Sequence, residues 1–369
     1  MDLAAYRAAG LYDPDAEGAS DRRALLEHLE DRGVSIEQML AADAIGSLHA
    51  ASSDIRIRPG NAISAETLAA EIGVSPDLLR RVTLAAGLAI GEGDYRDSDA
   101  ETFGLFASGA GVFGEEATLQ FTRAVGSSMA RVADAAISLF LVNVEGPIVQ
   151  QGGGATTLAE AADSAVDALE VVPSLMAGLF RLHMQAAIDR QRMVGDSSCE
   201  PGLFRLAVGF VDLVGFTPYS QDVSSDELAG FVESFEARSN DIVAARGGRV
   251  VKHIGDEVMF IESDAGGACD IALELIESFG GEAGVVPHAG IGFGPLVARG
   301  GDYYGPVVNL ASRIADLAVP GEVLVTDAVE EAARGSDAVL AFERAGRRSL
   351  KGFAEPVPLW SVTRPRPAP

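Results

Sequence analysis

Two stretches, RLAVGFVDLVGFT (205–217) and RVVKHIGDEVMFI (249–261), decide the fold of the C-terminal half. The first is a β-rich run that ends in a glycine-containing turn, and the second predicts a hairpin that turns at IGDE. Apolar residues follow helical spacing in three other segments, 226–245, 264–279 and 306–317. Further strands are expected over 288–293 and 322–326. The resulting order, β-α-β-β-α-β, predicts an α+β sandwich.

The first half of the chain has the apolar spacing of helices. Residues 25–40 fit two short helices with a break at Gly33, and residues 173–193 carry an apolar stripe. The segment 115–144 has one apolar helical face, for which a core or dimer helix is the simpler explanation and a lipid pocket the alternative. The glycine-rich segment 146–157 predicts a loop.

These patterns divide the chain into two domains and two short connecting or terminal segments. We expect an N-terminal all-α domain over 1–195 and a polar linker over 196–203. We expect a C-terminal α+β domain of ferredoxin-like type over 204–363, followed by a tail over 364–369.

Composition and charge exclude several classes of partner. The 369 residues are 48% hydrophobic, and the formal net charge is −26. Acidic residues outnumber basic ones in both halves, so no broad basic face is available for duplex nucleic acid or for an anionic membrane. The N-terminus, MDLAAYRAAG, lacks the pattern of a signal peptide, and no uninterrupted apolar run reaches the ~18 residues of a transmembrane segment. We therefore expect a cytoplasmic protein without a membrane span.

The segment FVDLVGFT (210–217) places a carboxylate beside a glycine turn. Asp212 ends the strand, where it could hold a metal ion while the backbone of Gly215, Phe216 and Thr217 receives phosphate oxygens. A strand-end aspartate is more often a simple cap. In the segment KHIGDE (252–257), Asp256 has ordinary turn chemistry as its simpler explanation. If the hairpin lies beside the first strand, the two aspartates could share two divalent cations.

A third segment, DYYGPVVNLASR (302–313), brings a polar pair to the start of a helix. Asn309 and Arg313 are four residues apart and project from one helix face. An arginine at such a position is usually a solvated charge. The functional alternative is that both side chains are directed at a ribose and a phosphate.

Together the three segments resemble the catalytic domain of class III nucleotidyl cyclases, with a match over residues 204–363. The resemblance implies that Asp212 and Asp256 bind two Mg²⁺ or Mn²⁺ ions per site. It implies that Lys252 and Asp302 select the base. It further implies that Asn309 orients the ribose, that Arg313 stabilises the transition state and that Lys351 binds triphosphate. Only two of the 28 basic residues are lysines, and both fall on these positions.

The family reaction is attack of the ribose 3′-oxygen on the α-phosphorus, with pyrophosphate as the leaving group. Arg299 is a further candidate for phosphate contact, with a solvated arginine as the equal alternative. Adenine N1 accepts and N6 donates a hydrogen bond, which suits Lys252 and Asp302, whereas guanine has the opposite polarity. We therefore predict ATP rather than GTP as substrate. In the family one site draws residues from two subunits, so a head-to-tail homodimer is implied.

Other interpretations compete with an adenylate cyclase. GGDYY (300–304) is superficially similar to the signature of diguanylate cyclases, and a guanylate cyclase is a second alternative. The segment 63–88 resembles a helix-turn-helix, with Gly73 at the turn and Ser75 as N-cap. It suggests a DNA-binding regulator with a cyclase-like module, but the acidic charge of this half makes a packing unit or partner surface the better explanation.

The whole N-terminal half is similar to the helical regulatory modules that precede some bacterial class III cyclases. Those modules restrain the catalytic domain, and some respond to pH or bind fatty acids. The resemblance implies an effector at this domain, either a proton or a small molecule or lipid. Among the three histidines of this half, His183 is the candidate regulatory residue because its helix leads into the linker, with a structural or surface role as the simpler alternative.

Overall fold

The computed structural model describes residues 2–91, 94–194, 203–280 and 284–365, and the chain divides into two compact units, 1–181 and 182–369. The predicted linker, 196–203, lies outside the described residues except for its last position, and so do residues 366–369 of the predicted tail. Each unit is described by itself.

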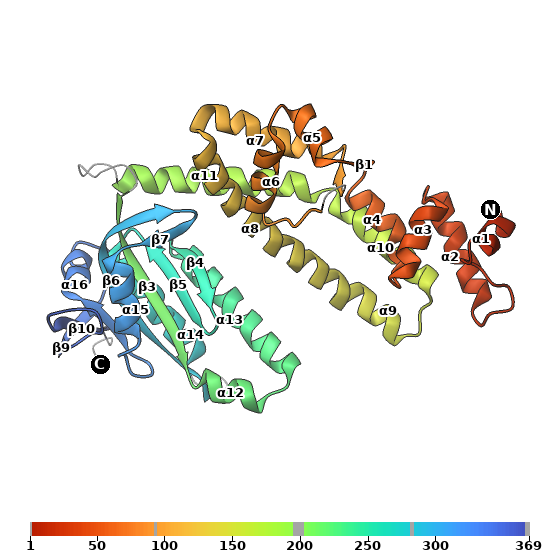
Figure 1. Cartoon of the computed structure of the whole chain (residues 1–369). Coiled ribbons are helices and arrows are strands. Elements are labelled where there is room, and N and C mark those ends of the chain that lie inside the picture. Colours follow the sequence, from red (N-terminus) through yellow and green to blue (C-terminus); the bar gives the residue numbers. More distant parts are fainter. Residues whose placement is uncertain (1, 92–93, 195–202, 281–283, 366–369) are drawn as a thin grey trace. The chain divides into compact units, whose positions relative to one another are not determined.

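The first unit is helical, as the sequence predicted, apart from a two-residue strand pair (Figure 1). Its helices are α1 (Leu3–Ala8), α2 (Ala19–Asp31), α3 (Ile36–Ala44), the 3₁₀ turn η1 (Leu48–Ala50), α4 (Ala51–Ile57), α5 (Ala65–Ile72), α6 (Pro76–Ala85), α7 (Asp99–Phe113), α8 (Glu115–Phe140), the π-helical turn η2 (Leu141–Glu145), α9 (Gly146–Gln150), α10 (Ala155–Leu169) and the start of α11 (Val172–Val194). The paired strands are β1 (Ala62–Ile63) and β2 (Tyr95–Arg96).

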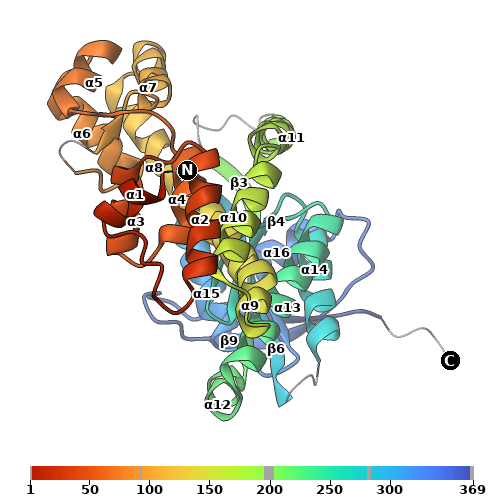
Figure 2. The same cartoon turned by 90° about the vertical axis from the view of Figure 1, so that its right-hand side faces the viewer.

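This unit has two separate hydrophobic clusters. One joins α1, α2 and α3 to α10 around Leu26, Leu29 and Met39. The other joins α5, α6 and α7 to the first turns of α8 around Leu68 and Phe103. Figure 2 shows α5, α6 and α7 as a group apart from α1, α2 and α3. The positive φ of Gly33, +80°, ends α2 where the sequence placed a break.

The predicted loop over 146–157 is wrong at both ends, because residues 146–150 form α9 and residues 155–157 begin α10. The helix that begins at Glu115 continues through η2 and α9 to Gln150. Pro147 has no N–H for the helix ladder, but it lies in the first turn of α9, directly after a π-helical turn, where proline is tolerated. The chain turns only at 151–154, where the glycines cluster.

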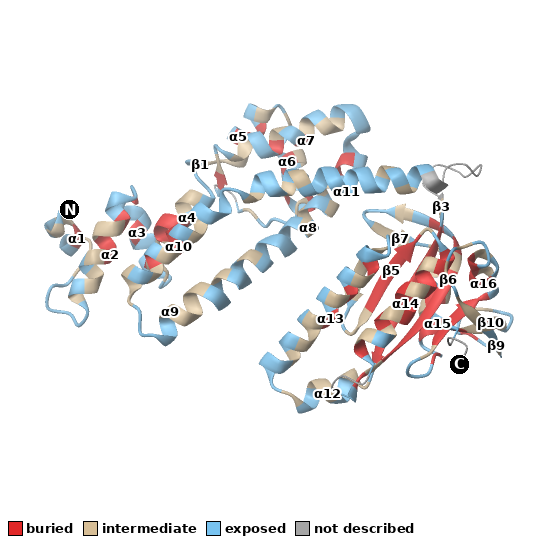
Figure 3. Cartoon of the chain, turned by 180° about the vertical axis from the view of Figure 1, so that it is seen from behind, coloured by how far each residue is buried: buried red, intermediate tan, exposed pale blue. Residues whose placement is uncertain are grey.

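The apolar face of this long helix is exposed in the chain. Phe121 is 59%, Ile137 56% and Leu139 67% exposed, and Figure 3 colours most of α8 and α9 as intermediate or exposed. Among the described residues, this is the one helix that is long and apolar enough to cross a membrane by length and composition. Length and composition alone are weak evidence for a membrane span, because a helix of a soluble protein can meet the same criterion.

The second unit is built on an eight-stranded mixed sheet with the order β4-β5-β3-β6-β8-β10-β9, and β7 pairs with β6. The strands are β3 (Leu203–Val214), β4 (Arg249–Ile254), β5 (Glu257–Glu262), β6 (Val286–Arg299), β7 (Asp302–Tyr304), β8 (Val323–Thr326), β9 (Ala341–Arg348) and β10 (Val357–Thr363). The helices are α12 (Phe216–Asp222), α13 (Ser225–Ala245), α14 (Ala265–Phe279), α15 (Pro306–Ala315) and α16 (Asp327–Ala333). The first six major elements follow the predicted β-α-β-β-α-β order.

Alternation along β3 divides the core between the two faces of the sheet. Ala207 and Val211 lie in the cluster that includes α13, α14 and α16. Leu206, Val208 and Phe210 lie in the cluster with α15. Asp212 continues this second series, so its side chain belongs to the α15 face.

Glycines allow α15 to lie close to the sheet. A Cβ at Gly290 on β6 would stand 2.1 Å from the backbone nitrogen of Ala315 and 2.5 Å from the carbonyl oxygen of Ala311. No side chain fits in that space, so glycine at this strand position sets the distance between β6 and α15.

Candidate functional site

The two predicted metal ligands lie at neighbouring strand ends. Asp212 lies near the end of β3, and Asp256 lies in the turn between β4 and β5. Strand β5 pairs with β3, so that Val258 is opposite Val211. The pKa of Asp256 is raised, mainly by burial and further by the negative charge of Asp212. The pairing of β5 with β3 places the hairpin beside the first strand, with Asp256 near the end of β3 that carries Asp212.

Negative charge accumulates around this pair. Burial, followed by the charges of Asp212, Asp316 and Asp256, raises the pKa of Glu257 to about 7. Within the described residues, no group of three or more His, Cys, Asp or Glu side chains is placed to hold a metal ion. Mg²⁺ is commonly held by one or two carboxylates together with substrate phosphates and water. Two aspartates with a further carboxylate beside them fit such a shared site.

The predicted base-selecting residues form an ion pair. Lys252 Nζ lies 2.6 Å from Asp302 Oδ2, although β4 and β7 are not neighbours in the sheet. A β-bulge between Val250 and Lys252 shifts the register of β4 by one residue. Lys252 is thereby opposite Met259, a residue of the α15-face cluster, while His253 contacts Phe235 of α13.

Helix α15 carries the other two predicted polar residues. Asn309 and Arg313 are both exposed, one turn apart on this helix. The guanidinium of Arg313 donates to Asp316 at 2.9 Å, so it is an ion-paired arginine within this chain. An anion that approaches this helix would compete with Asp316 for Arg313.

The predicted phosphate-binding residues occupy three loops or strand ends. Gly215 has a φ of +92° and turns the chain from β3 into α12. The Phe216 ring packs against Tyr219 and Phe231, so its side chain is structural and only its backbone is available to a ligand. Thr217, in the first turn of α12, is exposed, and so are Lys351 and Arg299. Arg299 ends β6 directly opposite Asp302.

Two models of known protein families match separate parts of the chain. Residues 204–362 match the model of the adenylate and guanylate cyclase catalytic domain, and residues 6–188 match that of the adenylate cyclase regulatory domain. An adenylate cyclase of Streptomyces coelicolor is 38% identical over 276 residues, which cover 72% of this chain and 70% of that protein. The chain belongs to the class III adenylate cyclase family.

Two mycobacterial relatives match nearly the whole length of this cyclase. An uncharacterized protein of Mycobacterium tuberculosis is 29% identical over 365 residues, 97% of this chain and 93% of that protein. A pH-sensitive adenylate cyclase of Mycobacterium tuberculosis is 29% identical over 374 residues, 96% of this chain and 91% of that protein.

Sequence reasoning missed His288, which contacts the candidate metal ligand Asp212. His288 on β6 is directly opposite Asp212 on β3, and its Nε2 lies 3.3 Å from Asp212 Oδ2. Burial lowers the pKa of His288, but the hydrogen bonds to Asp212 and to the Ala318 carbonyl, with nearby carboxylate charge, raise it overall. A polar residue in an otherwise apolar strand was the available signal, but its partner depends on strand register.

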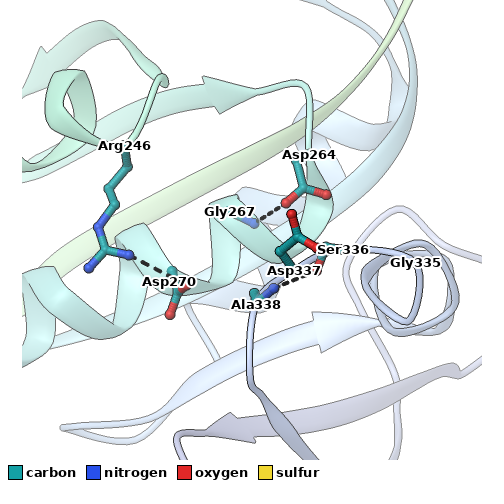
Figure 4. A pocket seen from close by; sticks show the side chains of 8 residues that line it. All are labelled: Arg246, Asp264, Gly267, Asp270, Gly335, Ser336, Asp337 and Ala338. Atoms are coloured by element: carbon teal, nitrogen blue, oxygen red, sulfur yellow. Dashed lines mark hydrogen bonds and ion pairs between the residues drawn. The ribbon is translucent and has the colours of Figure 1, made fainter.

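A cavity of about 580 Å³ lies elsewhere on the cyclase unit and contains none of the predicted residues. Two of its three acidic side chains, Asp264 and Asp270, have local partners (Figure 4). Asp264 accepts from the Gly267 N–H at 2.7 Å, and Asp270 pairs with Arg246 at 3.5 Å. These contacts cap and brace α14, so the cavity is not a candidate active site.

Two features were predicted in the N-terminal half, the regulatory candidate His183 and the helix-turn-helix-like segment 63–88. His183 is exposed on α11. The helix-turn-helix-like segment has its expected geometry, with Ser75 capping α6 through the Leu78 N–H. Both arginines of its second helix are ion-paired, Arg80 with Asp77 and Arg81 with Glu115. These acidic partners offset the charge that contact with DNA phosphates would require.

Proposed function

We propose that this cyclase converts ATP to 3′,5′-cyclic AMP and pyrophosphate. The Lys252–Asp302 pair is the observation that carries the proposal. Lys252 has further N–H groups and Asp302 further lone pairs, so each can bond to a base while they remain paired. Adenine offers an acceptor at N1 and a donor at N6, and guanine offers the reverse. The mismatch with guanine favours ATP over GTP.

We assign Asp212 and Asp256 to the binding of two Mg²⁺ or Mn²⁺ ions. When bound, such ions lower the pKa of the ribose 3′-hydroxyl and neutralise triphosphate charge. The surplus of carboxylates at this place supports the assignment, because Glu257 and Asp316 add to the negative charge. The backbone of Gly215, Phe216 and Thr217, with Lys351 and Arg299, is proposed to contact phosphates.

We assign Asn309 to orientation of the ribose and Arg313 to stabilisation of charge on the α-phosphoryl oxygens. An arginine in comparable phosphoryl chemistry contributes roughly 10³–10⁵ to the rate. Arg313 would exchange its contact with Asp316 for the substrate phosphate. The contact with Asp316 holds the guanidinium on α15 before substrate binds.

We further propose that the active form is a head-to-tail homodimer. The family resemblance supports this assembly, because metal-binding and base-binding residues of one family site come from opposite subunits. The chain matches one catalytic domain, so two copies would provide two equivalent sites. A monomer is then nearly inactive, and a dilute monomeric preparation with full specific activity would contradict the proposal.

The N-terminal domain, over 1–195, is proposed to regulate the catalytic domain, over 204–363, through the segment 196–203. The match to an adenylate cyclase regulatory domain and the pH-sensitive relative support this role. The effector is proposed to be a proton or a small molecule or lipid, and the protein is proposed to act in the cytoplasm. Equal activity and equal pH response of the full chain and of residues 200–369 would contradict regulation.

The first experiment is cyclic nucleotide formation by the purified full-length protein with Mn²⁺ at acidic and alkaline pH. ATP and GTP are supplied separately. Cyclic AMP from ATP alone supports the site assignment, and a pH difference supports regulation by the N-terminal domain. Cyclic GMP as the main product would contradict the assignment of Lys252 and Asp302.

A further inference from the structure

His288 is held between two acceptors on different elements. Its Nδ1 lies 2.7 Å from the carbonyl oxygen of Ala318, and its Nε2 lies 3.3 Å from Asp212 Oδ2. Both partners are hydrogen-bond acceptors, so the ring donates to both at once when each of its nitrogens carries a proton. The residue is only 6% exposed, and the shorter contact fixes the orientation of the ring.

We propose that His288 is a positioning residue that fixes the Asp212 carboxylate for metal binding. The Nε2–H group holds one carboxylate oxygen, while the Asp212 side chain stays 38% exposed and accessible to a cation. Hydrogen-bonded partners of metal-binding carboxylates restrict their rotation and raise metal affinity. The inference rests on the proposed metal-binding role of Asp212.

The contact with Ala318 gives His288 its rigidity. Ala318 follows α15, and its backbone N–H is bonded to Ile314 and Ala315 at the end of that helix. Strand pairing fixes the other side, because Asp212 and His288 are direct partners in the β3–β6 ladder. The imidazole therefore connects the β3 carboxylate to the element that carries Asn309 and Arg313.

Two amide variants separate positioning from packing. In His288→Asn the side-chain amide replaces Nδ1, so it can keep the Ala318 contact but cannot reach Asp212. In His288→Gln the amide replaces Nε2, so it can keep the Asp212 contact. A merely structural role predicts similar effects of both variants, or a larger effect of losing the shorter Ala318 bond.

The test measures Mn²⁺ binding to the full-length protein directly, from the free-Mn²⁺ signal in electron paramagnetic resonance, without turnover. His288→Asn is expected to weaken Mn²⁺ binding by about 10- to 100-fold, and His288→Gln by less than about threefold. The half-saturating Mn²⁺ concentration for cyclic AMP formation should shift in parallel. Thermal unfolding of each variant reports any loss of packing.

Asp212→Asn distinguishes failure of this inference from failure of the proposed function. If Asp212→Asn weakens Mn²⁺ binding but His288→Asn does not, the positioning role is wrong and the metal site stands. The positioning role is also wrong if His288→Gln is as defective as His288→Asn. If Asp212→Asn leaves Mn²⁺ binding unchanged, the metal assignment is wrong and the positioning role falls with it.

Discussion

Lys252 Nζ lies 2.6 Å from Asp302 Oδ2, and the two residues are 50 positions apart in the chain. The other oxygen of Asp302 accepts the Tyr303 N–H at 2.8 Å, which restricts rotation of the carboxylate. A cation and an anion are thereby presented together with a fixed polarity. This polarity is the basis for the predicted choice of adenine.

Altering the polarity of the pair should change the choice of nucleotide. Lys252→Glu combined with Asp302→Asn replaces the donor with an acceptor and supplies a donor opposite guanine O6. We expect the ratio of kcat/KM for ATP to that for GTP to fall at least about tenfold, the equivalent of one hydrogen bond. Steady-state assays with each nucleotide measure this ratio, and Arg344→Ala on β9 is the control. An unchanged ratio would show that the pair does not read the base.

Mixing two inactive variants should restore activity if sites are shared between subunits. Asp212→Asn removes one proposed metal ligand, and Arg313→Ala removes the proposed transition-state contact. Random pairing gives half heterodimers with one intact site each, so we expect about a quarter of the wild-type specific activity.

The measurement is cyclic AMP formation by each variant alone and after co-refolding or co-expression. Asp241→Asn, an exposed change on α13, is the matched control for loss of a carboxylate. Activity of the mixture no higher than that of the separate variants would be incompatible with a shared site.

Gly290→Ala should destabilise the cyclase unit and reduce its activity. The new methyl group would meet Ala315 N at 2.1 Å, so α15 must move and carry Asn309 and Arg313 with it. Overpacking of this kind costs about 1–3 kcal/mol, and a 1 Å displacement of catalytic groups can cost about 100-fold in rate.

Gly294→Ala, on the same strand, is the matched control. Its Cβ would lie 3.7 Å from Val307, which is an ordinary contact. Urea unfolding and kcat are compared for the two variants. Equal effects of both substitutions would show that close approach at Gly290 does not set the position of α15.

His253 should make the protein less stable as the pH falls. Burial lowers its pKa, against a smaller opposing effect of Glu236, and the ring packs against Phe235. The unfolded chain therefore takes up a proton near pH 6.5 while the folded chain still resists it. This contribution to stability is complete above that pH and is lost as the pH falls toward the lower pKa of the folded state.

Thermal unfolding at pH 7.5 and pH 5.5 measures this effect in wild type and in His253→Leu. The drop in Tm between the two pH values should be smaller in the variant. An equal or larger drop in His253→Leu would contradict the prediction.

The spacing of apolar residues along the chain predicted many of the strands and helices, because this spacing is a short-range property of the sequence. The alternating residues of β3 and the helical spacing over 226–245 depend only on neighbours, and α13 spans Ser225–Ala245. The same reasoning failed at 146–150, where the glycine content of the segment predicted a loop. A π-helical turn before α9 accommodates Gly146 and Pro147, and that depends on backbone geometry rather than composition.

The sequence by itself determined the class of the protein, because Asp212, Asp256, Lys252, Asn309 and Arg313 fall within three compact motifs. Tertiary structure decided how those motifs meet. The bulge in β4 turns Lys252 to the face where Asp302 lies, and antiparallel pairing of β3 with β6 places His288 against Asp212. Both relationships depend on strand register. A shift of one residue sends a side chain to the opposite face, and register is fixed only when the strands pair and the core closes around them.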